Sequence, residues 1–246
     1  MADNNYIEAF IHWLIKKTVY PFYRIIYFYK KNCWRISIHQ ADKLGYNQIS
    51  NTTEENRYPE IFDYVKKMLS DKNEICILSF GCSYGWECKS LRNYFPNAFI
   101  IGYDIFKENI DIAAKKNDDC NIKFTSEWEN VKKEKYFDIV FAMSVLCRTP
   151  HTINKKNISK IYSFERFEKQ ITELDSIIRK DGLLVLYNTN FLFTDTIVSE
   201  KYEPLSIPNF YDSGRIPKFD KNNKLLENQE YQYSIFRKTR NDATDN

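Results

Sequence analysis

The chain has 246 residues, which suffices for one α/β domain with an added layer but leaves little room for two full domains. Its 36 basic and 33 acidic side chains give a formal net charge of only +3, so the whole molecule offers no strong electrostatic case for nucleic-acid binding. The six cysteines form no CxxC pair, and no cluster of histidines accompanies them, so the sequence predicts no metal site. Cysteines in this pattern favour a reducing, cytoplasmic compartment.

Residues 6–35 are unusually aromatic and basic, and the first 35 residues carry six basic side chains against two acidic ones. Their charge-free runs are far shorter than the roughly 20 residues that a membrane span needs. One interpretation is peripheral contact with an anionic membrane. The alternatives are helices that pack on the core and cover its active-site mouth, or contacts between copies in an oligomer.

Polar residues dominate the stretch 36–58, which predicts a connecting loop. Apolar residues then recur at intervals of three and four over 58–69, as in an amphipathic helix. The predicted organisation is therefore an N-terminal helical extension with its loop (1–58), a main domain (59–240) and a frayed tail (241–246).

Residues 75–104 predict a β-α-β unit. An apolar strand over 75–80 leads into a turn bracketed by Gly81 and Gly85, and a short helix over 86–94 follows. A second apolar strand ends at Asp104, which lies 23 positions after Gly81. A carboxylate about 20 residues beyond a glycine turn is typical of nucleotide binding, where it takes the ribose hydroxyls.

The turn Ser79-Phe80-Gly81-Cys82-Ser83-Tyr84-Gly85 resembles motif I of the class I S-adenosylmethionine-dependent methyltransferases, commonly acidic-x-Gly-x-Gly-x-Gly. Two of the three glycines match, whereas Ser79 replaces the usual acid and Ser83 the middle glycine. The alternative is a generic Rossmann-like core that binds another nucleotide. The resemblance implies S-adenosylmethionine as cofactor and S-adenosylhomocysteine as product.

A second resemblance comes from residues 137–146, in which Phe-Asp followed by apolar and small residues is similar to motif IV of the same family. The Asn/Asp-Pro-Pro-aromatic signature of base methylation is absent. Residues 125–128, after a predicted strand over 121–124, correspond to the region that borders adenine in the family. The resemblance thus implies these cofactor-binding residues: Ser79, Phe80, Gly81, Cys82, Ser83, Gly85, Asp104, Ile105, Ser126, Glu127, Trp128, Met143 and Ser144.

The loop after residue 146 contains His151, which we select as a candidate general base because an imidazole with a pKa of about 6.5 suits proton removal from a hydroxyl acceptor. Arg148 is a candidate for holding an anionic acceptor group. Asn188 and Asn190 follow the next predicted strand (183–187) and are candidate acceptor contacts. Ordinary loop or surface roles are the alternative for all four.

An amphipathic stripe predicts a long helix from 164 to 178, which Gly182 closes. Residues 191–226 are irregular and read as an acceptor-covering insertion, and alternation over 231–236 predicts the last, antiparallel strand. The predicted fold is α/β: a Rossmann-like, seven-stranded, mostly parallel methyltransferase sheet with N-terminal helices.

The sequence therefore predicts a methyltransferase that acts on a small-molecule or glycan-precursor acceptor, on oxygen. An RNA or protein acceptor is the alternative among enzymes. A noncatalytic cofactor-binding scaffold subunit is the alternative from another class.

Overall fold

The structure, a computed structural model, describes residues 45–69, 72, 74–134, 136–210, 214–231 and 233–240. Chain contacts place residues Tyr46–Asn246 in one compact unit, which includes most of the stretch predicted as a connecting loop. The predicted N-terminal helices, the membrane or oligomer contact of residues 6–35 and the tail 241–246 lie outside the described residues. No helix within the described ranges is long and apolar enough to cross a membrane.

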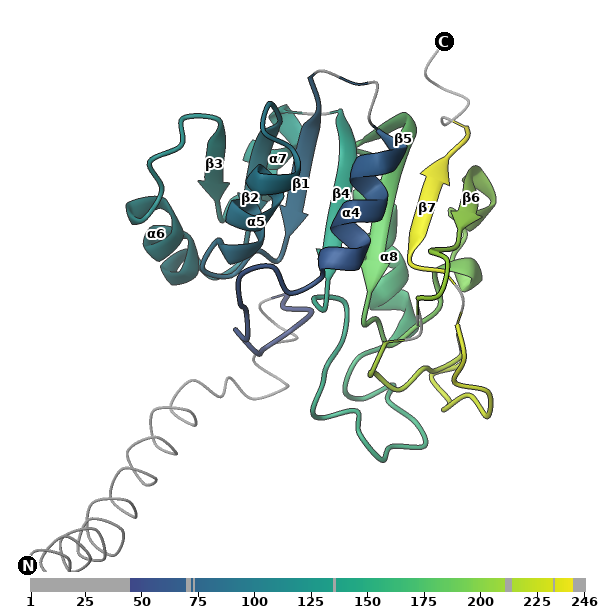
Figure 1. Cartoon of the computed structure of the whole chain (residues 1–246). Helices are drawn as coiled ribbons and strands as arrows, with labels where there is room; N and C mark the ends of the chain where they lie inside the picture. Colours follow the sequence, from purple (N-terminus) through teal and green to yellow (C-terminus); the bar gives the residue numbers. More distant parts are fainter. Residues whose placement is uncertain are drawn as a thin grey trace, which may run out of the picture. The chain divides into compact units, whose positions relative to one another are not determined.

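One seven-stranded sheet organises the unit, with the strand order β3-β2-β1-β4-β5-β7-β6 (Figure 1). Strands β1 to β5 are parallel, and β7 runs antiparallel between β5 and β6. This confirms the predicted Rossmann-like methyltransferase sheet. The strands are β1 (Cys76–Phe80), β2 (Phe99–Tyr103), β3 (Ile122–Thr125), β4 (Phe137–Met143), β5 (Ile178–Tyr187), β6 (Tyr202–Leu205) and β7 (Ile235–Lys238).

Helices cover both faces of the sheet (Figure 1). On one face Ile61, Leu91 and Ile110 join a single apolar cluster, and on the other Val131 and Phe167 join a second one. The central strand β4 is buried along its whole length, as expected of a strand enclosed by two layers. The helices are α4 (Pro59–Met68), α5 (Trp86–Tyr94), α6 (Lys107–Lys115), α7 (Trp128–Lys133) and α8 (Phe164–Asp175), with short 3-10 turns at Phe193–Asp195 and Ser199–Lys201.

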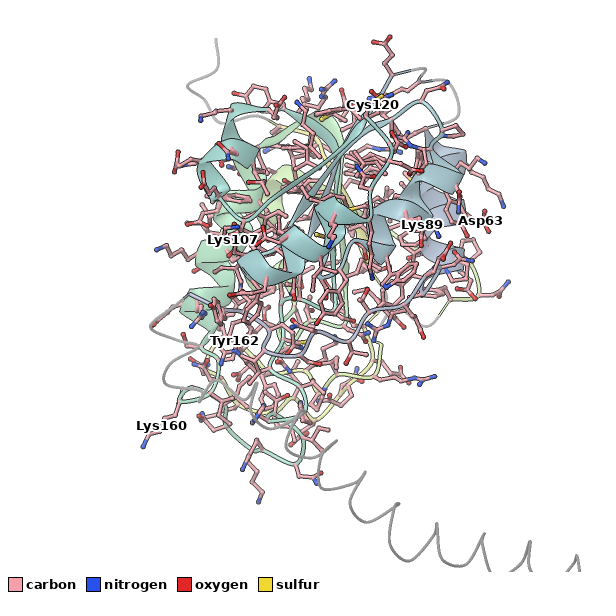
Figure 2. The ribbon with its side chains drawn as sticks, turned by 90° about the vertical axis from the view of Figure 1, so that its left-hand side faces the viewer. Asp63, Lys89, Lys107, Cys120, Lys160 and Tyr162 are labelled. Carbon is pink, nitrogen blue, oxygen red and sulfur yellow. The ribbon has the colours of Figure 1, made fainter. Side chains whose placement is uncertain are left out.

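The strand order reverses between β1 and β4, which are hydrogen-bonded neighbours although β2 and β3 lie between them in sequence. The carboxyl ends of these parallel strands therefore meet at one edge, where open α/β sheets bind ligands. In Figure 2 the molecule is seen from the β3 side, with Lys107 on α6 and Tyr162 among the loops of this edge. We call it the carboxyl edge.

The predicted boundary between the long helix and the strand after it was wrong. Helix α8 ends at Asp175, and Ile178 already pairs with Phe137 in the sheet. The pairing then jumps from Ile178 to Leu183, and Asp181 within the displaced residues adopts φ +62°. Gly182 therefore lies inside an irregular strand and does not cap a helix.

The C-terminal strands also differ from the expectation. Strand β7 is four residues later than the predicted start, at Ile235–Lys238, and β6 was not predicted. Pro204 within β6 argues against a central strand, but β6 is the edge strand, where a missing N–H can be tolerated. Part of the predicted insertion over 191–226 thus completes the sheet; its acceptor-covering role stays a prediction.

A buried ion cluster ties the end of α8 to the last two strands. The Asp175 carboxylate, 2% exposed, lies 2.8 Å from Lys201 Nζ and 2.9 Å from Lys238 Nζ, and it accepts a hydrogen bond from the Tyr202 hydroxyl at 2.8 Å. Burial alone would raise the pKa of Asp175, but the hydrogen bonds from Lys201, Lys238 and Tyr202 outweigh it and hold that pKa below its usual value. The cluster therefore stabilises the attachment of β6 and β7.

Replacing Asp175 with Asn should lower the free energy of unfolding at pH 7 by about 3–5 kcal/mol, because it leaves two lysines without their carboxylate. Since the folded-state pKa lies below the unfolded one, this contribution is present above about pH 4 and is lost as the pH falls through the folded-state pKa. Urea unfolding of Asp175→Asn at pH 7 and pH 3 tests both points. The exposed Asp111→Asn, which breaks only a surface pair with Lys107, is the control and should remain near wild type.

Candidate functional site

The glycine turn after β1 is fixed to the end of β2. The N–H groups of Gly81 and Cys82 both donate to the Tyr103 carbonyl, at 2.7 and 3.0 Å. Gly81, Ser83 and Gly85 all have positive φ, at 81°, 51° and 82°. A Cβ on Gly81 would lie 2.4 Å from Val145 Cγ2, so the position requires glycine for space as well as conformation.

Asp104 holds the turn from the other side. Its carboxylate accepts hydrogen bonds from the Ser83 N–H at 2.8 Å, the Phe106 N–H at 2.9 Å and Asn109 Nδ2 at 3.2 Å. Asp104 is 6% exposed, and burial raises its pKa although the three hydrogen bonds oppose the rise. A carboxylate offers about four acceptor sites, so Asp104 has capacity left for a donor such as a ribose hydroxyl.

An aromatic cluster lies at the ends of β1 and β2. The Phe80 and Tyr103 rings stack with centroids 5.3 Å apart, and Trp128 packs edge-on against both, at 5.8 and 5.3 Å. Trp128 begins α7 and Glu127 is its N-cap residue, but no side chain caps this helix. Glu127 is exposed, whereas Ile105, Ser126 and Trp128 are half-buried. The predicted adenine-bordering residues are thus brought to the same edge as the turn.

The ends of β4 and β5 share a hydrogen-bond network. Asn188 Nδ2 donates to Ser144 Oγ at 2.8 Å, and Ser144 Oγ lies 2.7 Å from the Tyr58 hydroxyl. The Arg215 N–H donates to Asn188 Oδ1 at 3.0 Å, so the amide nitrogen must face Ser144. Burial raises the pKa of Tyr58, which keeps its hydroxyl neutral. The two hydroxyls share one contact, which uses only one of their two hydrogens.

Residues 46–53 cross the carboxyl edge beside these groups, and we call them the crossing segment (Figure 1). Asn51 accepts from Ser83 Oγ through its carbonyl at 3.4 Å, and its side chain contacts Asn109. Tyr46 packs on Phe106 with ring centroids 4.3 Å apart. The segment thus lies over the glycine turn and the end of β2.

Arg148 anchors the crossing segment. Its guanidinium is fully buried, donates to the carbonyls of Asn47 (2.7 Å) and Tyr46, and lies 5.9 Å from the centroid of the Tyr162 ring, which is labelled in Figure 2. Asn190, also fully buried, accepts from the Arg148 N–H at 2.8 Å and donates to the Pro217 carbonyl at 2.9 Å. Both side chains position loops around the site, and neither faces solvent as an acceptor contact or a surface ion pair would.

A family model described as a methyltransferase domain matches residues 53–193, more than half of the chain. The chain belongs to the methyltransferase domain family. This confirms the predicted resemblance to class I S-adenosylmethionine-dependent methyltransferases, and the matched range contains the glycine turn, Asp104, the aromatic cluster and the end of β4. No curated protein matches the sequence.

Several solved methyltransferases are similar to this chain. N-methyltransferase NodS from Bradyrhizobium japonicum WM9 shares 14% identity over 75% of this chain and 99% of its own, with a TM-score of 0.46. The plantazolicin methyltransferase BpumL, solved in complex with SAH, shares 19% identity over 52% of this chain and 46% of its own, with a TM-score of 0.39. The match therefore spans about half the length of BpumL.

His151 lies in the loop after β4, where its backbone N–H donates to the Arg148 carbonyl at 2.8 Å. Its side chain is half-buried. The same loop carries the buried Arg148, so the crossing segment and His151 are attached to one piece of backbone. Met143, at the end of β4, is buried in the apolar cluster beneath α4 and α5.

Two residues of the site were not predicted from the sequence. Tyr58 was assigned only to a helix, and Glu87 was not singled out at all. The Glu87 carboxylate lies on the first turn of α5 and accepts a hydrogen bond from Ser79 Oγ at 2.7 Å. The absence of the usual acid at position 79 was the signal that could have directed a search for a carboxylate nearby.

Proposed function

We propose that this chain transfers a methyl group from S-adenosylmethionine to an oxygen atom of a small molecule or glycan precursor. The observation that carries the proposal is the glycine turn at the end of β1, whose conformation is held by the Asp104 carboxylate at the end of β2 in a chain of the methyltransferase family. The fit to a nucleoside rests on Asp104, whose carboxylate has acceptor capacity left for a ribose hydroxyl after three hydrogen bonds.

The residues around the turn would hold this cofactor in sections. Ser79, Phe80, Gly81, Cys82, Ser83 and Gly85 would surround its methionine portion, and Asp104 would accept from the ribose hydroxyls. Ile105 with the exposed surfaces of Ser126, Glu127 and Trp128 would border adenine, and Met143 and Ser144 would close the site at the end of β4. When bound, S-adenosylmethionine supplies a methyl group on a positively charged sulfur, ready for in-line attack.

The acceptor is proposed to bind over the ends of β4 and β5. Tyr58, Ser144 and Asn188 present neutral hydroxyl and amide groups there, which suit a hydroxylated molecule better than a polyanion. Most of the rate enhancement would come from holding the acceptor in line with the methyl group. The free thiols of Cys76, Cys82, Cys88, Cys120 and Cys147 fit a reducing compartment such as the cytoplasm.

Calorimetric titration with S-adenosylmethionine, S-adenosylhomocysteine and NAD tests the cofactor. We expect micromolar binding of both sulfur nucleotides and no binding of NAD, because the turn lacks the GxGxxG pattern of dinucleotide sites. Binding of NAD alone would contradict the proposal. Binding of the sulfur nucleotides without transfer to any hydroxylated metabolite, sugar nucleotide, RNA or peptide would favour the scaffold alternative.

Asp104→Ala should weaken S-adenosylhomocysteine binding by about 1–3 kcal/mol, because it removes a charge-assisted acceptor for the ribose and loosens the Ser83 peptide. Calorimetry measures the change, with circular dichroism to verify folding. Asp111→Ala removes an exposed carboxylate from α6 and should bind as wild type does. Unchanged affinity of the Asp104 variant would remove this residue from the site.

His151→Gln should reduce methyl transfer by about 10²- to 10⁴-fold if the imidazole takes the acceptor proton. Its S-adenosylhomocysteine affinity should stay within about twofold of wild type, since His151 is not assigned to the cofactor. Transfer of a labelled methyl group to the acceptor found in the screen provides the measurement. A fully active variant would show that the methyltransferase needs no base at this position.

A further inference from the structure

Glu87 is a charged group for which the described fold provides no counterion. Among the residues that the structure describes, Ser79 Oγ is its hydrogen-bond partner, at 2.7 Å, and no lysine or arginine forms an ion pair with it. Arg57 acts on it only at longer range, because that guanidinium donates to the Thr52 carbonyl at 3.1 Å and lies over the Tyr58 ring. A hydrogen bond from one hydroxyl offsets only a small part of the free-energy cost of removing a carboxylate from water.

The pKa of Glu87 reflects this lack of partners. Burial raises it to about 7, although the Ser79 hydrogen bond and the charge of Arg57 both lower it. Its position on the first turn of α5 should also favour the ionised form, through the partial positive charge of the helix N-terminus. Desolvation outweighs the Ser79 hydrogen bond and the Arg57 charge, so the free protein holds a carboxylate that a cation would stabilise.

Glu87 also lies at the right place for a ligand. It follows the glycine turn by two positions, and Ser79, which donates to it, is the last residue but one of β1. The carboxylate therefore lies at the carboxyl edge, beside the last residue but one of β1, and it belongs to no ion cluster among the described residues.

We propose that Glu87 binds the α-ammonium group of the amino-acid portion of the cofactor. The inference rests on the proposed function, which places that portion at the turn over residues 79–85. An ammonium group has three N–H donors that can meet a carboxylate oxygen, whereas a sulfonium has none. Motif I usually has an acidic residue where this chain has Ser79, and Glu87 would supply that negative charge from its place beside Ser79.

Glu87→Gln tests the assignment, because it keeps the size of the side chain and removes its charge. The probes are S-adenosylmethionine, S-adenosylhomocysteine and 5′-methylthioadenosine, which has the same nucleoside and sulfur but no amino-acid portion. We expect the variant to bind the first two about ten- to a hundredfold more weakly. Its affinity for 5′-methylthioadenosine should stay within about twofold of wild type.

Glu108→Gln is the matched control, since Glu108 holds the same second position of the next helix, α6, and is exposed. It should leave all three affinities unchanged. An equal loss for all three probes in Glu87→Gln would assign Glu87 a structural role and overturn the proposal. A loss confined to S-adenosylmethionine would mean that the carboxylate faces the sulfonium, and no loss would remove Glu87 from the site.

The pH dependence gives a second readout. Wild-type affinity for S-adenosylhomocysteine should rise as the pH increases from 6 to 8 and Glu87 ionises, and Glu87→Gln should abolish this rise. Ser79→Ala should move the midpoint to higher pH, because the lost hydrogen bond lowers the pKa of Glu87. Among the described residues, the charge of Arg57 acts on the carboxylate, and burial raises the pKa of Tyr58 and of Cys82, a rise to which the Glu87 charge adds. A rise that persists in Glu87→Gln would overturn the assignment.

The binding experiment distinguishes a failure of the Glu87 assignment from a failure of the proposed function. If wild-type protein binds none of the three sulfur nucleosides, the cofactor assignment fails and this inference fails with it. If wild type binds all three with the same affinity, the cofactor assignment stands and the ammonium has no partner in the site. Thermal unfolding of the free protein at pH 8 shows whether the variant is folded; its Tm should not fall, since it loses a charge that burial destabilises.

Discussion

The attachment of the glycine turn to the end of β2 is the constraint on which the rest of the site depends. Two N–H groups of the turn share the Tyr103 carbonyl, and a third donates to the Asp104 carboxylate. Because β1 and β2 are parallel and in register, these groups meet without any distortion of the strands. Backbone that is satisfied in this way can hold positive φ at three alternate positions, Gly81, Ser83 and Gly85.

The buried Arg148 side chain holds the crossing segment over the same edge. A guanidinium removed from water is costly unless its donors are used, and here carbonyls of the crossing segment accept from it. These carbonyls belong to residues about 100 positions earlier in the chain. Arg148 therefore couples the position of the crossing segment, which contacts Ser83 and Asn109, to the loop that carries His151.

Local sequence patterns were sufficient for the fold and for the turn. Residues 75–104 alternate strand, glycine turn, helix and strand with spacings that leave few alternatives, and α5 was predicted with its observed bounds. The boundary between α8 and β5 was missed because Ile178 continues the helical stripe in sequence, whereas its partner Phe137 in β4 is set by tertiary pairing. Strand β6 was missed because edge strands tolerate the proline that usually excludes a strand.

The site was less accessible to sequence reasoning because its contacts are not local. Tyr58 and Ser144 are 86 positions apart, and Arg148 meets Asn47 over 101 positions. No periodicity encodes such pairs. Arg148 and Asn190 were predicted as acceptor contacts from their place after strands, but their burial depends on what packs above them, and that is decided by the crossing segment.

Arg148 and Asp175 are buried and Glu87 is half-buried, and the three charges differ in the partners that the fold gives them. Arg148 donates to two backbone carbonyls, and Asp175 meets two ammonium groups and a phenol. Each is paired within the chain, so each stabilises the fold in the absence of any ligand. Glu87 has one hydroxyl and a pKa that burial raises to about 7. Among the described residues Glu87 thus has no charged partner, and the proposed ammonium contact would supply one.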